Sequence, residues 1–535
     1  MAGTVDEERA RGSDSGGGVE EVEVRSPRTG EVLYRIRGAS DADVAEVYAR
    51  AWEAFETLRG MPVRARLDEM LKLKRYLLEN RERIITRVCE ETGKSRMDAL
   101  LTEIFGSLDL VDYYDKHAEA ILADRKVKTP LVLFPKKSRV YYEPVGPVLV
   151  IAPWNYPLVL GFQPFVCAFL AGNPVILKPS SYTPLKGVLE EMVEGSGFMR
   201  NALQVVYGTR QTGGKLIEAK PRKIHFTGSV GAGKKIMAQA AAHLIPVELE
   251  LGGKDPMIVF DDVNLERTVS GALWGGFVNG GQTCTSIERL YVQEGVHDAF
   301  VASLKEKVGR MKTLVAGDFD EEELEMGCMT AEFQIKTVQA QVNEAREKGA
   351  EIVVGGERKP GTRSYAPTIV ANADASMAVA HDETFGPVIV LTKFATEAQA
   401  IELANRSPFG LSASVWTADL ARADRVARAL ETGNVSINNA LATQANSALP
   451  FGGVKDSGFG RYKGAEGLHA FCNVKSVLVD KQSGKLELNW YPYGKQKYRL
   501  FSRMLDALFS GKRFGLAKAA LLGIQLERLG KRRRP

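Results

Sequence analysis

The sequence of 535 residues contains little cysteine: there are only five, scattered along the chain. They form neither close pairs nor the short spacings typical of metal ligands, so the sequence indicates neither disulfide bridges nor a zinc site. We therefore expect no metal and a reducing, cytoplasmic compartment. The five residues are Cys89, Cys167, Cys284, Cys328 and Cys472.

The sequence also lacks long apolar runs and the pattern of a secretory signal. No stretch approaches the roughly 18 consecutive apolar residues that a membrane-spanning helix requires. Residues 1–18 are acidic and rich in glycine and serine, without the basic start and apolar run of a secretory signal. We interpret residues 1–18 as a disordered leader and expect no segment that crosses a bilayer.

Overall composition is unremarkable, but the charge is unevenly distributed. Hydrophobic residues make up 44% and charged residues 26%, which is ordinary for a globular protein and excludes disorder of the whole chain. A chain of this length predicts at least two domains. Residues 491–535 hold twelve Lys and Arg against Asp506 and Glu527, a local charge of +10, whereas the first 490 residues carry −5.

The first hundred residues predict a hairpin and two helices. Apolar residues alternate loosely over residues 22–36 around the turn signal Ser-Pro-Arg-Thr-Gly, which indicates two paired strands. Ser40 can cap a first helix, and a longer helix is predicted over residues 67–88 because its apolar residues share one face. We interpret both apolar faces as core.

Two later regions predict parallel sheets. Between residues 148 and 260 short apolar strands alternate with helical or turn segments, and the pattern returns between residues 292 and 416. This alternation favours α/β domains with parallel strands. The strands are predicted at residues 148–151, 174–177, 204–206, 223–226 and 257–260 in the first region, and at 351–354 and 388–391 in the second.

Four polar side chains stand in short motifs with glycine or proline. Asn155 lies in Ala-Pro-Trp-Asn-Tyr-Pro, Glu250 in Leu-Glu-Leu-Gly-Gly-Lys, Cys284 in Gly-Gly-Gln-Thr-Cys-Thr and Glu383 in Asp-Glu-Thr-Phe-Gly-Pro. A lone cysteine is more often a small buried hydrophobe than a nucleophile. In this order and at this spacing, however, the motifs resemble those of the aldehyde dehydrogenase superfamily, over about residues 22–480.

The resemblance implies an α/β fold with two parallel-sheet, Rossmann-type domains and a β-hairpin arm that joins subunits. Strands at residues 131–134, 139–143 and 474–479 would form the arm, whose unpaired edges predict a homodimer or homotetramer. The implied divisions are an NAD(P)-binding domain (19–128 and 147–250), a catalytic domain (251–460), the oligomerisation arm (129–146 and 470–482) and a basic amphipathic extension (483–535).

One glycine-rich stretch is the candidate pyrophosphate site. Phe226-Thr-Gly-Ser-Val-Gly-Ala-Gly-Lys-Lys follows a predicted strand and opens a helix, so its backbone N–H groups and helix dipole suit an anion. It departs from a P-loop at Lys235 and from the GxGxxG fingerprint at Ile236, and by itself it is equally consistent with a tight turn. The resemblance implies that NAD or NADP binds here, between Gly228 and Gly233.

The resemblance also implies two ribose contacts. Lys178 resembles the family lysine that holds the adenosine ribose, and Glu383 the carboxylate that binds the nicotinamide ribose. Serine at Ser181 replaces the glutamate with which NAD-preferring members often accept the 2′-hydroxyl, so NADP stays possible. The residues expected at the cofactor are Trp154, Lys178, Ser181, Gly228, Ser229, Gly233, Leu251, Glu383 and Phe385.

Three residues acquire catalytic roles through the resemblance. Cys284, as thiolate, would attack the aldehyde to give a thiohemiacetal, and the thioester that follows stays hydrolysable. The Asn155 amide and the Cys284 N–H would hold the oxyanion, and Glu250 would activate the water that releases the acid. Members that pass the acyl group to coenzyme A generally lack this glutamate, so Glu250 favours hydrolysis. Asn473 replaces a glutamate linked to proton relay in many members, which puts that relay in question.

The residues after Asn155 predict the substrate class. If a helix begins near Pro157, then Tyr156, Leu160 and Gln163 share the face below Asn155, and the resemblance implies that this face is part of the substrate tunnel. Neither this face nor the loop at residues 441–449, which caps the tunnel mouth in the family, holds the cation that a semialdehyde carboxylate would need. We expect an uncharged aliphatic or aromatic aldehyde; the alternatives are a semialdehyde dehydrogenase and a non-catalytic, membrane-associated homologue. The expected substrate residues are Tyr156, Leu160, Gln163, Thr283, Thr285 and Phe451.

The tail mixes basic with apolar and aromatic residues at helical spacing. This pattern is typical of a helix that lies on an anionic membrane surface, and it suits equally a helix that docks on the body of the protein or on a partner subunit. Nucleic-acid binding by the terminal basic run is a less favoured interpretation, and we expect no nucleic-acid partner. A peripheral position at the inner face of a membrane is therefore an alternative to a purely cytoplasmic one.

Overall fold

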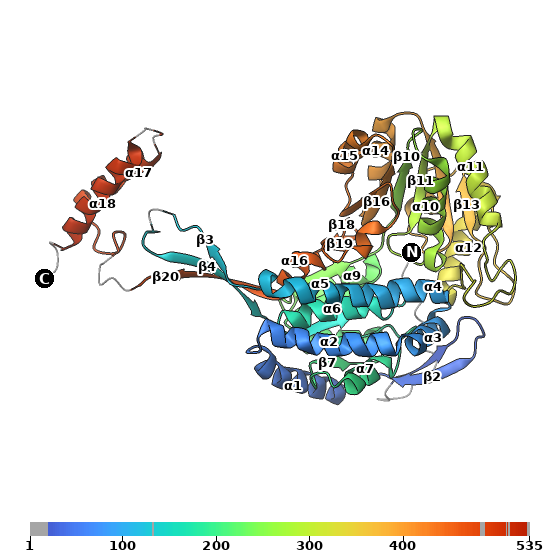
Figure 1. Ribbon diagram of the computed structural model, residues 1–535, viewed down its shortest axis with the longest axis horizontal. Helices are drawn as coiled ribbons and strands as arrows, with labels where there is room; N and C mark the ends of the chain where they lie inside the picture. Colours follow the sequence, from blue (N-terminus) through green and yellow to red (C-terminus); the bar gives the residue numbers. More distant parts are fainter. Residues whose placement is uncertain (1–19, 131–132, 482–486, 510, 512–513, 532–535) are drawn as a thin grey trace. The chain divides into compact units, whose positions relative to one another are not determined.

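The computed structural model describes residues 20–130, 133–481, 487–509, 511 and 514–531 (Figure 1). The expectation of a disordered leader at residues 1–18 lies outside these residues. The chain forms two compact units. We call Met1–Ala123 with Tyr141–Lys475 the main unit, and Asp124–Val140 with Ser476–Pro535 the small unit.

The main unit begins with the hairpin that the sequence predicts. Strands β1 (Glu21–Arg25) and β2 (Val32–Arg37) pair antiparallel. Helix α1 (Asp41–Leu58) follows, and the Ser40 hydroxyl accepts from the Asp43 N–H (3.1 Å) while the Asp43 carboxylate accepts from the Ser40 N–H (2.8 Å). This reciprocal capping box confirms Ser40 as the N-cap.

The prediction of one long helix over residues 67–88 is wrong. Two helices, α2 (Val63–Glu79) and α3 (Arg81–Thr92), meet at Asn80, whose φ of −103° and ψ of 12° leave the helical region. The apolar face continues across the break because both helices bury it in one core. Three further segments follow: α4 (Arg96–Asp98), a π-helix η1 (Ala99–Phe105) and α5 (Gly106–Ile121).

The first α/β sheet has six strands in the order β19-β9-β8-β5-β6-β7. All its pairings are parallel except that of β19 with β9. Its strands are β5 (Val148–Ile151), β6 (Val175–Lys178), β7 (Leu203–Val205), β8 (Lys223–Thr227), β9 (Val247–Glu250) and β19 (Gly458–Phe459). Its helices are α6 (Val159–Leu170), α7 (Val188–Ser196), α8 (Arg210–Glu218) and α9 (Val230–Ala241).

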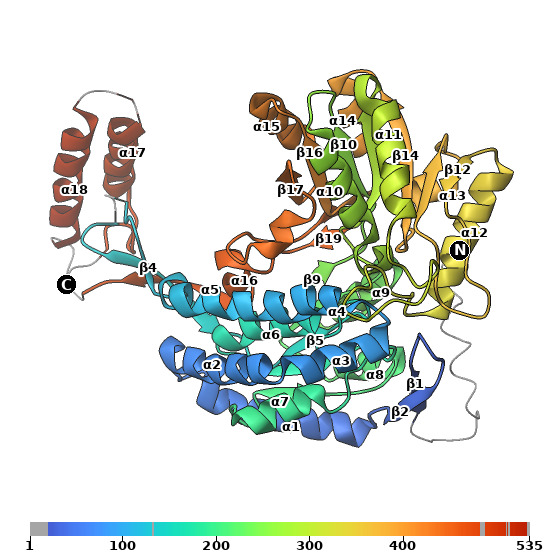
Figure 2. The same cartoon turned by 45° about the vertical axis from the view of Figure 1, so that its right-hand side comes forward.

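Both faces of this sheet are buried, as its continuous apolar strands predict. Val148 and Val150 point into the core shared with α2, α5 and α6, whereas Leu149 and Ile151 point into the core shared with α1, α8 and α9. Figure 2 shows β5 beside α6. The period of two along β5 therefore separates two helical layers.

The second sheet has seven strands in the order β12-β13-β14-β11-β10-β16-β17 and is parallel except for the β12–β13 pair. Two sheets of parallel strands covered by helices confirm the predicted α/β class. The strands are β10 (Asp255–Val259), β11 (Ile287–Gln293), β12 (Glu351–Val354), β13 (Thr368–Ala371), β14 (Val388–Phe394), β16 (Ser412–Trp416) and β17 (Asn434–Ile437). The helices are α10 (Leu265–Phe277), α11 (Glu294–Gly309), α12 (Glu332–Glu347), α13 (Ala378–His381), α14 (Glu397–Asn405) and α15 (Leu420–Ala429). Helix α16 (Gly464–His469) follows in the sequence but packs against α5 and α6.

A third sheet, in the order β20-β4-β3, contains the predicted arm strands. Strand β20 (Cys472–Val479) confirms the strand predicted at residues 474–479, and β4 (Lys137–Pro144) the one at 139–143. The strand predicted at residues 131–134 is wrong where the structure describes it: Leu133 lies in a 3-10 segment and Phe134 in a turn, and β3 (Arg125–Val127) pairs with β4 instead. Prolines on both sides of residues 131–134 lack the N–H groups that a ladder needs.

The small unit ends in a helical hairpin of α17 (Lys495–Phe509) and α18 (Gly515–Lys531). The two helices pack against each other through Ala507, Ala519 and Leu522. Among the residues that the structure describes, every helix falls short of the length and apolar character needed to cross a membrane.

Candidate active site

Four predicted site residues follow the carboxyl ends of neighbouring parallel strands. Asn155 follows β5, Lys178 ends β6, Gly228 follows β8 and Glu250 ends β9. In an open parallel sheet this edge is the usual place for ligands. The motifs that lie far apart in the sequence are thus brought to one edge.

Cys284 lies on a turn between α10 and β11, and the backbone before it is unusual. Asn279, Gly280 and Gly281 have φ angles of 53°, 63° and 69°, three successive left-handed residues. A Cβ at Gly281 would lie 2.1 Å from the Gly386 carbonyl oxygen, so only glycine fits there. The glycines before the cysteine therefore serve a tight turn that presents the thiol.

Hydrogen bonds tie this turn to Asn155. The Asn155 Nδ2 donates to the Gln282 carbonyl (2.9 Å), and the Asn279 Nδ2 donates to the Asn155 carbonyl (3.2 Å) and the Gln282 carbonyl (3.1 Å). The Tyr156 and Thr283 hydroxyls bond to each other at 2.6 Å. The predicted residues Asn155 and Tyr156 are thus bonded, in one constellation, to the turn that carries Thr283 and Cys284.

The surroundings of Cys284 disfavour its thiolate. Burial raises the pKa of the Cys284 thiol far above its usual value, and the carboxylates of Asp255, Glu250 and Glu383 raise it further. The side chain packs against the apolar cluster of Leu411, Phe451 and Tyr462, which places Phe451 beside the thiol. The thiol therefore needs a proton acceptor or additional positive charge before it can attack.

Glu250 is buried and its ionised form is disfavoured. Burial raises the pKa of its carboxyl well above the usual value, with Arg461 and Lys463 acting in the opposite direction. Its Oε2 atom has no hydrogen-bond partner among the described residues. A buried carboxyl with a raised pKa and an unused acceptor is suited to receive a proton from a water molecule.

The glycine-rich stretch fits an anion at the N-terminus of α9. The Ser229 hydroxyl caps the helix by accepting from the Ala232 N–H (3.4 Å), and the position of a Cβ at Gly231 is open. A Cβ at Gly233 would lie 2.6 Å from Leu251, so this glycine allows close packing between α9 and β9. Lys178 is buried at the end of β6, which is separated from β8 by β5. Open N-terminal N–H groups and a buried lysine at the same edge of the sheet match a dinucleotide.

Glu383 approaches the Leu-Gly-Gly-Lys motif closely. Its Oε1 accepts from the Gly253 N–H (3.0 Å), and a Cβ at Gly252 would lie 2.3 Å from its carboxylate. Burial, with Glu288 as the next contributor, raises the pKa of Glu383 to about 8. The edge of the Phe385 ring meets Trp154 at 5.3 Å between centroids. The glycines of this motif therefore make room for the carboxylate.

Other predicted residues are less closely tied to the thiol. The helix α6 begins at Val159, two residues beyond the predicted Pro157. Gln163 donates to the Gly106 carbonyl (3.1 Å), and Leu160 is half-buried. The Thr285 hydroxyl is buried without a partner among the described residues, and Asn473 is exposed, donating to Glu143 (3.3 Å).

Five charged residues at the site escaped the sequence analysis. Lys94 pairs with Glu103 (2.9 Å) and Lys254 with Glu288 (2.5 Å), and all four side chains are at most 2% exposed. Lys463, also buried, donates to the Gln444 carbonyl (2.6 Å) in the loop at residues 441–449, and burial lowers its pKa to about 8. A single sequence gives no sign that these lysines are buried, although Lys254 ends the Leu-Glu-Leu-Gly-Gly-Lys motif that contains Glu250.

Comparison with known proteins agrees with this geometry. The sequence model of the aldehyde dehydrogenase family matches residues 14–477. A 4,4′-diapolycopene aldehyde oxidase from Methylomonas sp. is 40% identical over 90% of both chains. A relative from Mycolicibacterium smegmatis, named as a candidate NADP(+)-dependent succinate-semialdehyde dehydrogenase, is 35% identical over 86% of this chain and 90% of its own.

A solved structure gives the same result for the fold. The aldehyde dehydrogenase of Mycobacterium tuberculosis, complexed with NAD+, superposes with a TM-score of 0.81 at 32% identity, covering 86% of this chain and 95% of its own. The fold is that of an α/β oxidoreductase. The chain belongs to the aldehyde dehydrogenase family, so the oxidation of an aldehyde to an acid is the activity of its family.

Proposed function

We propose that this chain oxidises an uncharged aldehyde to its carboxylic acid with NAD or NADP, using Cys284 as nucleophile. The observation that carries this proposal is the bonded constellation that joins the Cys284 turn to Asn155, next to a buried Glu250 with an unused acceptor. A candidate nucleophile, a candidate oxyanion donor and a candidate base in one largely buried place support this proposal, because a non-catalytic homologue would not need them.

The first half of the reaction is covalent. The Cys284 thiol releases its proton to solvent and its sulfur attacks the carbonyl carbon. The oxygen that becomes negative is held by the Asn155 Nδ2 and the Cys284 N–H. The Asn155 amide exchanges its bond with the Gln282 carbonyl for a bond to this oxygen. Loss of one such donor typically costs about 3–4 kcal/mol of transition-state stabilisation.

The residues around α9 and Glu383 fit the cofactor. The N-terminus of α9 would hold the pyrophosphate, Lys178 the adenosine ribose and Glu383 the nicotinamide ribose. When bound, the nicotinamide supplies the acceptor for the hydride of the aldehyde carbon. Ser181, in place of an acidic residue, leaves room for a 2′-phosphate as well as for a hydroxyl.

Glu250 completes the reaction. As a carboxylate it takes a proton from the water that attacks the thioester, and the carboxylic acid leaves while the Cys284 thiol is restored. Because burial raises the pKa of Glu250, the fraction of the ionised base increases with pH, and so should the rate of hydrolysis.

Two substitutions test these roles. Cys284→Ala should abolish turnover while cofactor binding persists, whereas Cys328→Ala, which removes a buried thiol elsewhere in the chain, should retain turnover. Glu250→Gln should give one burst of reduced cofactor per active site without steady release of acid. Steady turnover in Cys284→Ala, or in Glu250→Gln, would remove the corresponding residue from the mechanism.

The apolar cluster beside Cys284 favours an uncharged substrate, whereas Lys463 gives the semialdehyde alternative its support. A carboxylate-bearing aldehyde could bind this ammonium in place of the Gln444 carbonyl. Initial rates with aldehydes of increasing chain length and with succinate semialdehyde decide between them. A preference for the semialdehyde that disappears in Lys463→Met would establish the alternative.

We also propose that the small unit binds the surface of an anionic bilayer. It holds twenty Lys and Arg against five Asp and Glu, a net charge of +15, whereas the main unit carries −10, with 51 against 61. Its helices expose large apolar side chains as well as their basic ones. Both features match an anionic lipid surface. The exposed apolar residues of the two helices are Tyr498, Leu505, Phe509, Leu516, Leu521 and Ile524.

Sedimentation of the full chain with vesicles tests this surface. We expect binding to vesicles of phosphatidylserine and phosphatidylcholine, weakened by salt and absent with phosphatidylcholine alone. The variant Tyr498→Ser/Leu505→Ser/Phe509→Ser should lose binding, and Leu244→Ser/Leu420→Ser, which changes exposed leucines of the main unit, should keep it. Equal binding by both variants would contradict the proposal.

The sheet β20-β4-β3 supports a homodimer or homotetramer. Its outer strands leave edges unpaired within the described chain, and exposed edges of this kind favour pairing with a second copy. Analytical ultracentrifugation of the full chain should show a dimer or tetramer, and a proline at Lys126 should shift it towards monomer. A monomer in the unchanged chain would exclude this role for the sheet.

A further inference from the structure

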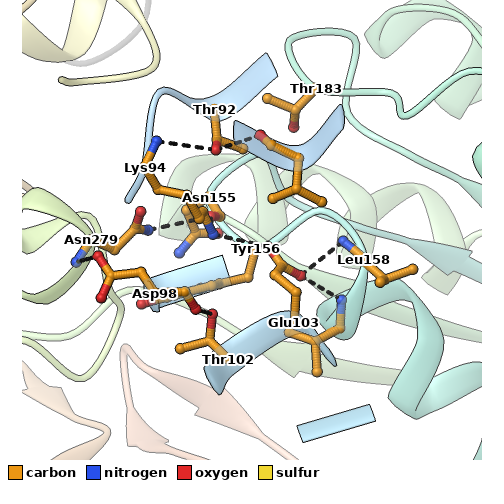
Figure 3. Close-up of polar contacts among 12 residues, drawn as sticks. Thr92, Lys94, Asp98, Thr102, Glu103, Asn155, Tyr156, Leu158, Thr183 and Asn279 are labelled. Atoms are coloured by element: carbon orange, nitrogen blue, oxygen red, sulfur yellow. Dashed lines mark hydrogen bonds and ion pairs between the residues drawn. The ribbon is translucent and has the colours of Figure 1, made fainter. Parts of the chain in front are cut away.

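We propose that the buried Lys94–Glu103 ion pair is a positioning device that fixes the backbone of Asn155 for oxyanion binding. The inference rests on the proposed function of Asn155 and adds two residues to the machinery of that reaction. Neither residue touches the reacting atoms in this arrangement; both act through the segment that carries the Asn155 amide (Figure 3).

Lys94 holds the start of this segment. Its Nζ donates to the Asn155 carbonyl oxygen (2.8 Å) and to Glu103 Oε1 (2.9 Å), and it lies 4.1 Å from the centre of the Tyr156 ring. Both charged side chains have no solvent exposure. The ammonium therefore has its direction set by protein groups alone, and one of them is the carbonyl of the oxyanion donor.

Glu103 holds the end of the same segment. Its second oxygen, Oε2, accepts from the Leu158 N–H (3.1 Å) and the Val159 N–H (2.8 Å), where α6 begins. These N–H groups at a helix start have no partner within the helix, so the carboxylate satisfies them. One ion pair thus binds residues 155–159 at both ends. Asn155 cannot shift without breaking the buried hydrogen bond between its carbonyl and Lys94.

The same stretch of chain also holds the Cys284 turn. The Asp98 carboxylate accepts from the Asn279 N–H (3.1 Å), and the Asn279 side chain donates to the Asn155 carbonyl. Asp98 and Glu103 are separated by the start of the π-helix η1. Such widened turns frequently occur at functional sites. Residues 94–103 therefore connect the oxyanion donor with the turn that carries the nucleophile.

A purely structural role for the pair is the competing explanation. Buried ion pairs are often no more stabilising than apolar residues of the same volume, because desolvation offsets their attraction. A structural pair would change stability and expression. A positioning pair would in addition change the rate of the step in which Asn155 acts, and only when Asn155 is present.

The test is the rate of the first turnover of reduced cofactor, measured with Lys94→Met in two backgrounds. In the otherwise unchanged chain, Lys94→Met should lower this rate by roughly 10- to 100-fold. This loss is smaller than the roughly 10²- to 10³-fold loss that follows removal of an oxyanion donor. In an Asn155→Ala background the same substitution should change the rate less than twofold. The dissociation constant of NAD(P), from fluorescence titration, should stay within twofold in Lys94→Met.

A second variant and a control complete the experiment. Glu103→Gln keeps the side-chain volume but removes the negative charge that binds Lys94 and the two backbone N–H groups. It should lower the first-turnover rate by about 3- to 10-fold, again only when Asn155 is present. Lys223→Met removes a partly buried lysine paired with Glu248 (2.7 Å) and should leave the rate unchanged. If Lys94→Met does not fold, Glu103→Gln gives the result.

The outcomes separate this inference from the proposed function. Unchanged rates in folded Lys94→Met and Glu103→Gln, or equal losses in both backgrounds, would overturn the positioning role while Asn155 keeps its own. An unchanged rate in Asn155→Ala would overturn the oxyanion assignment, and the positioning role with it. Turnover in Cys284→Ala would contradict the mechanism as a whole.

Discussion

Two buried ion pairs, Lys94–Glu103 and Lys254–Glu288, have the same construction. The first holds the loop that would bind the substrate, and the second holds the loop that would bind the cofactor. Glu103 accepts from two successive backbone N–H groups in the segment after Asn155, those of Leu158 and Val159. Glu288 accepts from the two N–H groups that follow Glu383, those of Thr384 (2.8 Å) and Phe385 (2.9 Å). In each case a lysine pairs with the carboxylate, Lys94 with Glu103 and Lys254 with Glu288. Each pair therefore holds the backbone of one loop, that of Asn155 or that of Glu383.

The lysines differ in what else they bind. Lys94 donates to the backbone carbonyl of Asn155 itself, whereas Lys254 donates to the Thr384 hydroxyl (2.9 Å), one residue beyond Glu383. The first loop carries a neutral amide that would meet the substrate oxygen, and the second a carboxylate that would meet the cofactor. The comparison teaches that one structural device can set the geometry of either partner, since a buried charge has few alternative positions.

Breaking either pair should have the largest effect on stability. Lys94→Met and Lys254→Met each leave a buried carboxylate without its cation, and each should lower the free energy of unfolding by about 3–5 kcal/mol. Replacing both partners with apolar residues, as in Lys254→Met/Glu288→Leu, should cost less. Urea unfolding followed by fluorescence measures this. The surface pair of Lys348 and Glu344 gives the control, and Lys348→Met should change the value by less than about 0.5 kcal/mol.

Breaking the two pairs should change different parameters: cofactor affinity for one pair and the first-turnover rate for the other. Lys254→Met should weaken NAD(P) binding by about 10-fold, equivalent to about 1.4 kcal/mol, and should leave the first-turnover rate at saturating cofactor within threefold. Lys94→Met should lower that rate and spare cofactor binding. Stopped-flow absorbance and fluorescence titration on both variants give the two numbers. If both variants changed the same parameter, the two loops would not be held independently.

Much of this arrangement could be predicted from the sequence, because local patterns determine it. The apolar strands at residues 148–151 and 223–226 predicted the sheet, and Ser40 its helix cap. The motifs around Asn155, Glu250 and Cys284 predicted the candidate site through their resemblance to a family. The structure then brought Asn155 and the Cys284 turn into hydrogen-bond contact.

Other features depend on contacts between distant residues and gave no local signal. Lys94 lies 61 positions before Asn155, the backbone that it binds, and a charged residue at a helix end normally indicates solvent. The strand Arg125–Val127 has two charged residues, so it lacks apolar alternation and was missed. The break at Asn80 was missed because both helices continue one apolar face into a common core.

The smallest expected effect is the pH dependence of NAD(P) binding, which should depend on the Glu383 loop and not on the Asn155 loop. Burial raises the pKa of Glu383 to about 8, whereas the Asn155 amide does not titrate in this range. An ionised carboxylate is the stronger acceptor for ribose hydroxyls, so NAD(P) affinity should increase as pH rises from 6.5 to 9. We expect a change of about 3- to 10-fold centred near pH 8, since bonds to the charged form favour that form. Glu383→Gln should give a flat profile, and Lys94→Met should keep the profile of the unchanged chain. A profile that stays pH-dependent in Glu383→Gln would assign the titration to another group and remove this difference between the loops.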